Sequence, residues 1–131
     1  MLLKDKVVII SGIGPGLGVK LGIEAAREGA RALAIGARSA DKLDDAEQRI
    51  RAVNAQCKVL KQVTDITDRA ACEALAASAV HSYGRIDALF NSRFFHGDID
   101  YVSTGKLYDW NAVLCTNLLG TLKLTQAVLP G

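Results

Sequence analysis

The feature that most constrains this chain is an apolar run that ends in a glycine-rich turn. Residues 7–10 are Val-Val-Ile-Ile, and glycine then stands at positions 12, 14, 16 and 18. A buried strand that passes through such a turn into a helix brings bare backbone N–H groups to a phosphate, because glycine has no Cβ to block the approach. The segment predicts a site for a nucleotide pyrophosphate. Taken alone, it is also compatible with an ordinary turn between a strand and a helix.

Strand and helix patterns alternate along the whole chain. Strands are expected over 6–11, 31–37, 58–63 and 86–91, and helices over 16–29, 40–54 and 67–83. We expect Ser39 and Thr67 to cap the second and third helices, and Gly29 and Gly84 to end the first and third. A last helix starts at 103 or 104 and carries one stripe of helically spaced residues: Trp110, Val113, Leu114, Asn117, Leu118, Thr121, Thr125 and Val128.

This alternation predicts an α/β fold, a Rossmann-type doubly wound parallel sheet with strand order 3-2-1-4. Residues 1–131 form one dinucleotide-binding domain, which we expect to be truncated after the fourth strand and its following helix. The sheet would then present an apolar edge, which favours aggregation or pairing with another chain.

Composition excludes several classes of function. A net charge of +2, with scattered basic residues, argues against nucleic-acid or membrane binding. The three cysteines form no Cys-x-x-Cys pair, and neither histidine, His81 or His96, has metal-ligand spacing, so no metal site is expected. The acidic residues at 44, 45 and 47 are expected to form a solvated helix face. We expect a cytoplasmic location, since no signal peptide or membrane-spanning stretch is present.

Four segments, in order, resemble the short-chain dehydrogenase/reductase family. They are Ser11–Gly18 (the cofactor turn), Asp65–Asp68 (the segment after the third strand), Gly84–Asn91 (the start of the fourth strand) and Trp110–Pro130 (the helix with the family's asparagine). The match covers essentially the whole chain, but only about the N-terminal half of a typical family member. The resemblance implies an oxidoreductase that uses a nicotinamide cofactor.

The resemblance also implies which residues bind the cofactor. Asp65 and Ile66 would contact adenine, although Asp65 could equally cap the helix that begins near Thr67. Asn91 and Ser92 would lie at the nicotinamide-side ribose, where Arg93 and Phe94 depart from the small residues of the family. The pyrophosphate would lie against the turn formed by Ser11, Gly12, Gly14, Pro15, Gly16, Leu17 and Gly18.

The end of the second strand predicts the choice of cofactor. An acidic residue there would bind the ribose 2′-hydroxyl and repel a 2′-phosphate. Arg38 and Ser39 occupy this place instead, and a guanidinium offers a fork of donors suited to phosphate. We therefore expect NADP(H) in preference to NAD(H). The alternative is a solvated arginine near a helix start.

The catalytic role of this chain is predicted from the resemblance alone. The resemblance assigns Asn117 to a water-linked proton relay; the alternative is that Asn117 is an asparagine at a half-exposed turn without a catalytic role. The family's proton donor is a Tyr-x-x-x-Lys pair preceded by a Ser. Residues 87, 105 and 112, four positions after the three tyrosines, are Asp, Gly and Ala. We therefore expect the chain alone to be inactive.

The sequence thus predicts an N-terminal fragment of an NADP(H)-dependent oxidoreductase that interconverts alcohols and carbonyls by hydride transfer. Small-molecule substrates are expected, and a homo-oligomer for the complete enzyme. The main alternative is a non-catalytic nucleotide-binding module, either a sensor or an assembly subunit. A truncated product without a function of its own is the third possibility.

Overall fold

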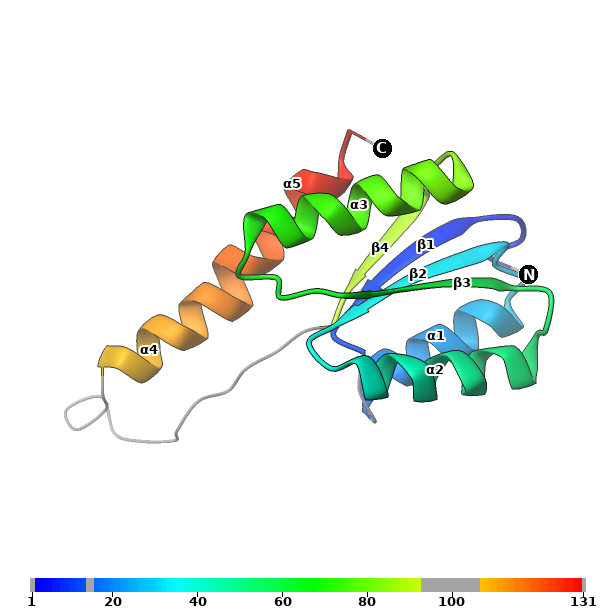
Figure 1. Cartoon of the computed structure of the whole chain (residues 1–131), viewed down its shortest axis with the longest axis horizontal. Helices are drawn as coiled ribbons and strands as arrows, with labels where there is room; N and C mark the ends of the chain where they lie inside the picture. The colour runs from blue at the N-terminus through cyan, green and yellow to red at the C-terminus, as the bar shows by residue number, and fades with distance from the viewer. Residues whose placement is uncertain (1, 14–15, 93–106, 131) are drawn as a thin grey trace.

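The computed structural model of the chain describes residues 2–13, 16–92 and 107–130. Four strands alternate with helices along this part of the chain (Figure 1). The elements are β1 (Val7–Ser11), α1 (Leu17–Arg27), β2 (Ala32–Ala37), α2 (Ala40–Val53), β3 (Lys58–Val63), α3 (Arg69–Tyr83), β4 (Ala88–Asn91), α4 (Leu107–Leu114), η1 (Cys115–Gly120) and α5 (Thr121–Val128).

The strands form one parallel sheet in the order β3-β2-β1-β4, which confirms the predicted topology. In its centre, Val8 of β1 stands opposite Leu33 of β2 on one side and Ala88 of β4 on the other. Helices α1 and α2 cover one face of the sheet, and α3 and α5 cover the other (Figure 1). The order reverses between β1 and β4, so the glycine turn after β1 lies at the switch point where such sheets bind ligands.

Side chains that alternate along β1 and β2 divide the core into two halves. Val8 and Leu33 pack toward α1 and α2, whereas Ile9 and Ala34 pack toward α3 and α5. These four residues have no exposed surface, so both central strands are buried on both faces. Continuous apolar runs of this kind are typical of parallel sheets covered by helices.

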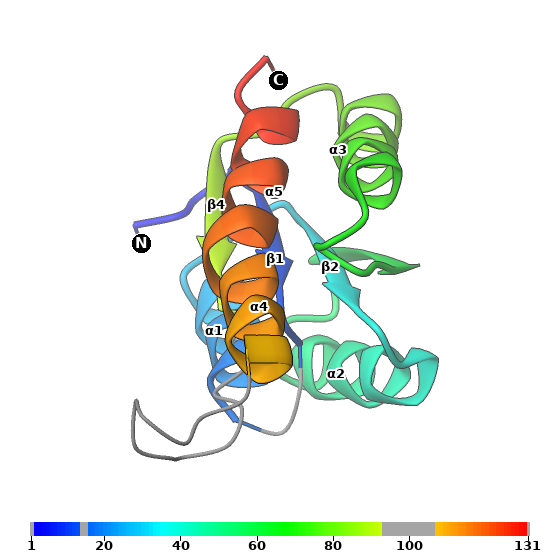
Figure 2. The same ribbon diagram turned by 90° about the vertical axis from the view of Figure 1, so that its left-hand side faces the viewer.

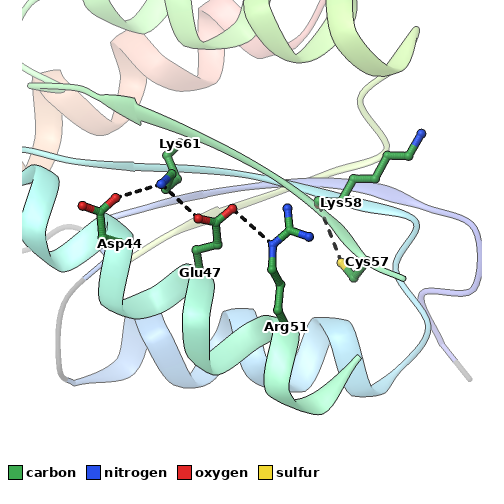
Figure 3. Close-up of polar contacts among 6 residues, drawn as sticks. All are labelled: Asp44, Glu47, Arg51, Cys57, Lys58 and Lys61. Carbon is green, nitrogen blue, oxygen red and sulfur yellow. Dashed lines mark hydrogen bonds and ion pairs between the residues drawn. The ribbon is translucent and has the colours of Figure 1, made fainter. Parts of the chain in front are cut away.

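The edge strand β3 is tied to α2 by ion pairs (Figure 3). Lys61 Nζ lies 2.8 Å from Asp44 Oδ1 and 2.9 Å from Glu47 Oε1, and Glu47 also pairs with Arg51. The hydrogen bond from Lys61 lowers the pKa of Glu47, so this carboxyl stays charged. The helix face that we expected to be solvated therefore also anchors the edge strand β3. The exposed Lys58 and Lys61 disfavour pairing of this edge with strands of other molecules.

The buried positions of the last helix differ from the single stripe predicted for it. Helices α4 and α5 are joined by the π-helical segment η1 into one continuous helix (Figure 2). Leu114 and Leu118 of the expected stripe are 55% and 52% exposed, whereas Leu124, outside it, is fully buried. A π-helical turn takes one more residue than an α-helical turn, so the 3.6-residue period fails across it. The predicted start at 103 or 104 lies outside the described residues.

The helix ends confirm some predicted caps and correct others. Ser39 caps α2, and Gly84 ends α3 in a left-handed conformation, both as expected. The expected cap at Thr67 is wrong, because Asp68 caps α3 by accepting a hydrogen bond from the Ala70 N–H. Helix α1 ends at Arg27, and Gly29 closes it as expected, with a φ of +87° and an N–H that donates to the Ala26 carbonyl oxygen at 3.1 Å. Across the described residues, none of the helices combines the length and apolarity needed to span a bilayer.

Candidate functional site

A pocket of about 510 Å³ opens at the carboxyl ends of the strands. It is bounded by the glycine turn after β1, the β2–α2 connection, the loop after β3 and the end of β4. Its size falls in the range of ligand-binding pockets. The lining residues are Gly12, Ile13, Gly16, Leu17, Gly18, Ala37, Arg38, Ser39, Lys42, Thr64, Ile66 and Ser92.

The floor of the pocket is backbone that only glycine allows. Gly12 has a φ of +76°, which L side chains rarely adopt. A Cβ on Gly18 would lie 2.3 Å from the Gly12 carbonyl oxygen, so α1 can start this close to the turn only without a side chain there. Among the described residues no side chain caps α1, and its first turn holds no acidic residue. Its first N–H groups are thus available to an anion. The predicted residues 14 and 15 lie outside the described residues.

Ser11 and Ser92 link the ends of β1 and β4 beside this floor. The Ser92 N–H donates to the Ser11 carbonyl oxygen at 3.3 Å, and the Ser92 hydroxyl donates to the same oxygen. The Ser11 hydroxyl is 1% exposed and has no hydrogen-bond partner within the part of the chain that the structure describes. Ser11 itself does not line the pocket, whereas Gly12 and Ser92, on either side of this contact, do.

Two cations stand at the β2 side of the pocket. Arg38 and Lys42 are exposed, line the pocket, and make no ion pair or side-chain hydrogen bond with other described residues. Ser39 lies between them and accepts a hydrogen bond of 3.5 Å from the Lys42 N–H. Sequence reasoning found Arg38 and Ser39 but missed Lys42. The pattern that could have indicated Lys42 is its position four residues after Arg38, at the start of a helix.

The loop after β3 forms another wall. Thr64 and Ile66 are both 4% exposed and line the pocket. Between them, Asp65 Oδ1 accepts hydrogen bonds from the Thr67 N–H at 2.9 Å and from the Thr67 hydroxyl at 2.7 Å. Asp65 therefore shapes the loop itself and is not part of the pocket lining.

The two predicted asparagines lie on β4 and on η1. Asn91 ends β4 and donates from Nδ2 to Thr125 Oγ1 at 3.3 Å. Asn117 lies half-buried on η1. Neither is part of the pocket lining. Arg93, Phe94 and His96, together with Tyr101, lie outside the described residues.

Comparison with known proteins identifies the family. The model of the family "short chain dehydrogenase" matches residues 6–131. The chain belongs to the short-chain dehydrogenase family. The 3-oxoacyl-[acyl-carrier-protein] reductase of Thermotoga maritima is 35% identical over 130 residues, which are 99% of this chain and 51% of the reductase. An uncharacterized oxidoreductase of Listeria innocua is 33% identical over 130 residues, 99% of this chain and 51% of that protein.

Solved structures agree with this assignment. Levodione reductase superposes with a TM-score of 0.93 at 29% identity, over 98% of this chain and 49% of that one. NAD⁺-bound xylitol dehydrogenase gives 0.90 at 28% identity, over 96% and 47%. This short-chain dehydrogenase thus spans about half the length of the relatives it matches.

Proteins of the short-chain dehydrogenase family bind nicotinamide cofactors, and the residues present here fit such a group. Gly12 and Gly18 leave room for a pyrophosphate against the uncapped start of α1. Arg38 and Lys42, which pair with none of the described residues, provide charge at the β2 end, and Ile66 provides an apolar wall for a base. The pocket can therefore hold an extended anionic dinucleotide along the ends of the strands.

Proposed function

We propose that this protein takes part in the NADP(H)-dependent interconversion of alcohols and carbonyls by hydride transfer. The observation that carries the choice of cofactor is the charge of the pocket. Its described lining holds Arg38 and Lys42 and no carboxylate. A guanidinium and an ammonium favour a phosphate on the adenosine ribose, whereas nothing in this lining would repel it.

Each part of the chain has a role in this proposal. The backbone of the glycine turn and the start of α1 bind the pyrophosphate, and Thr64 and Ile66 orient the adenine. When bound, the cofactor supplies the hydride, so the protein's contribution is position and proton transfer. We assign Asn117 to a water-linked proton relay. The 131 residues contain no Tyr-x-x-x-Lys, so the proposal gives this chain cofactor binding and Asn117's share of the relay.

The proposal extends to substrates, assembly and location. The family implies small-molecule substrates, and we propose an alcohol or a carbonyl compound. Two similar proteins are named as reductases, of levodione and of a 3-oxoacyl-[acyl-carrier-protein]. We also propose a cytoplasmic location and, for the complete enzyme, a homo-oligomer, to be checked by cell fractionation and by light scattering during gel filtration.

Direct binding measurements test the choice of cofactor. Titration calorimetry with NADPH and NADH is expected to show tighter binding of NADPH. Replacement of Arg38 by alanine (Arg38→Ala) is expected to weaken NADPH binding about tenfold, since a charge-assisted pair is lost, and to leave NADH binding within about twofold. Arg49→Ala is the matched control, because Arg49 pairs with Asp45 on the same helix and does not line the pocket. Equal affinities of the native protein for both cofactors would contradict the preference.

A further inference from the structure

A lysine on the last helix is bonded to the loop that walls the nucleotide pocket. Lys123 of α5 donates from Nζ to the Thr67 carbonyl oxygen at 2.7 Å, in a partly buried hydrogen bond between residues 56 positions apart. Thr67 belongs to the segment 64–68 between β3 and α3, which we name the adenine-side loop. A charged donor on a main-chain carbonyl is among the stronger hydrogen bonds in proteins. This contact fixes the backbone of the loop from behind the pocket.

Two further contacts hold the adenine-side loop at the same place. The buried Cys72 Sγ lies 3.4 Å from the Ile66 carbonyl oxygen. Burial raises the pKa of the Cys72 thiol, so it stays protonated and can donate. On the helix side, a Cβ on Gly120 would lie 2.9 Å from Ile66 Cγ1, so the last helix packs its bare backbone directly against the Ile66 side chain.

The loop therefore lies between the pocket and the last helix. Ile66 and Thr64 line the pocket, while Gly120 and Lys123 contact the loop from the other side. The turn made by Asp65 and Thr67 stiffens the loop internally. The Lys123 bond attaches the loop to α5, and Ile66 packs against Gly120 at the end of η1.

We propose that Lys123 is a positioning residue for the nucleotide site: its ammonium holds the adenine-side loop against α5 so that Ile66 and Thr64 stay in place as the pocket wall. The inference rests on the proposed nucleotide-binding function. The same contacts would couple nucleotide binding to the helix that carries Asn117, because a ligand in contact with Ile66 stabilises the packing of that helix at Gly120.

Binding of the adenine half of the cofactor tests the inference. The probes are ADP-ribose and its 2′-phosphate, measured by calorimetry on the native protein and on Lys123→Met. We expect the variant to bind both probes about tenfold more weakly, because a charge-assisted hydrogen bond that orders the wall is lost. Arg38→Ala, in contrast, is expected to weaken only the 2′-phosphorylated probe. Lys123→Arg keeps a charged donor and should restore binding to within about twofold of the native protein.

Hydrogen exchange without ligand separates positioning from general stability. Lys123→Met is expected to raise amide exchange in 64–68. The matched control is Gln126→Ala, which removes a 3.3 Å hydrogen bond that α5 accepts from Arg69, the first residue of α3; neither residue lines the pocket. This control should leave both exchange in the loop and nucleotide affinity unchanged.

Three outcomes would overturn the inference. Unchanged affinity and unchanged loop exchange in Lys123→Met would remove the role of Lys123 and leave the proposed function standing. Equal losses in Lys123→Met and Gln126→Ala would reduce the contact to general stabilisation. Failure of the native protein to bind either probe would overturn the proposed function together with the inference.

Discussion

On the β2 side of the pocket, Arg38 and Lys42 make no ion pair within the described chain, whereas on the β4 side Ser92 and Asn91 direct their polar atoms at the protein itself. At one end of the pocket, therefore, charged groups are available to a ligand, and at the other end the polar groups are hydrogen-bonded within the protein. Elsewhere some surface cations are paired, as Arg27 is with Glu24, and others, such as the exposed Lys20 and Lys58, form no ion pair with described residues. What distinguishes Arg38 and Lys42 is their place in the pocket lining, which supports the proposed phosphate site on this side.

The glycine turn joins the two sides, and its disruption is expected to have the largest effect. In Gly18→Ala the new Cβ would meet the Gly12 carbonyl oxygen, which is backbone and cannot move aside. We expect nucleotide binding to weaken by about 100-fold or more, equivalent to about 3 kcal/mol. Calorimetry measures the loss, and circular dichroism checks the fold. Gly22→Ala is the matched control on the same helix, since Gly22 does not line the pocket and a Cβ there would meet the flexible end of the Ile50 side chain, at 2.9 Å, and a comparable loss in that variant would contradict the steric argument.

A variant far from the pocket shows whether a loss of folding stability alone changes nucleotide affinity. Asp87 Oδ2 accepts a hydrogen bond of 2.8 Å from the Val7 N–H, at the end of β1 opposite the pocket, and Oδ1 pairs with Arg85. We expect Asp87→Asn to lower the free energy of unfolding by about 1.5 kcal/mol at neutral pH and to leave nucleotide affinity unchanged. Urea titrations and calorimetry measure the two quantities.

The pH dependence of that variant follows from the pKa of Asp87. The Val7 N–H, with Arg85, lowers this pKa below its ordinary value. The stabilisation is therefore present above the unfolded-state pKa, about 3.9, and is lost as the pH falls through the lowered folded-state value. The native protein and Asp87→Asn should converge in stability in strong acid. Asp45→Asn, on the exposed face of α2, is the control. A difference in the free energy of unfolding between the native protein and Asp87→Asn that stays constant at every pH would contradict this role of Asp87.

The smallest expected effect concerns the second cation. Lys42→Ala is expected to weaken binding of the 2′-phosphorylated probe about threefold, less than Arg38→Ala, because a single exposed ammonium offers no bidentate geometry. Competition binding measures it, with the exposed Lys20→Ala of α1 as the control. On the β4 side, Ser92→Ala should leave the preference for the 2′-phosphate unchanged. A larger change of preference in Ser92→Ala than in Lys42→Ala would reverse the comparison of the two sides.

Patterns local in the sequence predicted most of the fold. The alternation of apolar runs and helical periods was sufficient for the strand order, for the bounds of β3, and for the caps at Ser39 and Gly84. The cap of α3 was mistaken because Thr67 and Asp68 are both good cap residues. Only the structure shows that Asp65 already engages the Thr67 hydroxyl.

The site was less predictable where it depends on distant contacts. Arg38 and Thr64 each directly follow a strand end, and Lys42 stands four residues after Arg38, so these three had local signals, of which only that of Arg38 was used. The bond between Lys123 and Thr67 joins residues whose proximity depends on the whole α3–α5 layer. Nothing in the local spacing of the last helix indicates where its hydrogen bonding changes to the π form.

That π segment sets the angular phase of the last helix. An α-helix turns by about 100° per residue, so one extra residue in a turn rotates everything beyond it by about that angle. Deleting a residue between 115 and 120 would therefore leave Leu124 and Val128 facing away from the core, or would turn Asn117 about the helix axis if they stayed. The direction in which Asn117 faces is fixed by how many residues separate it from the buried leucine two turns later.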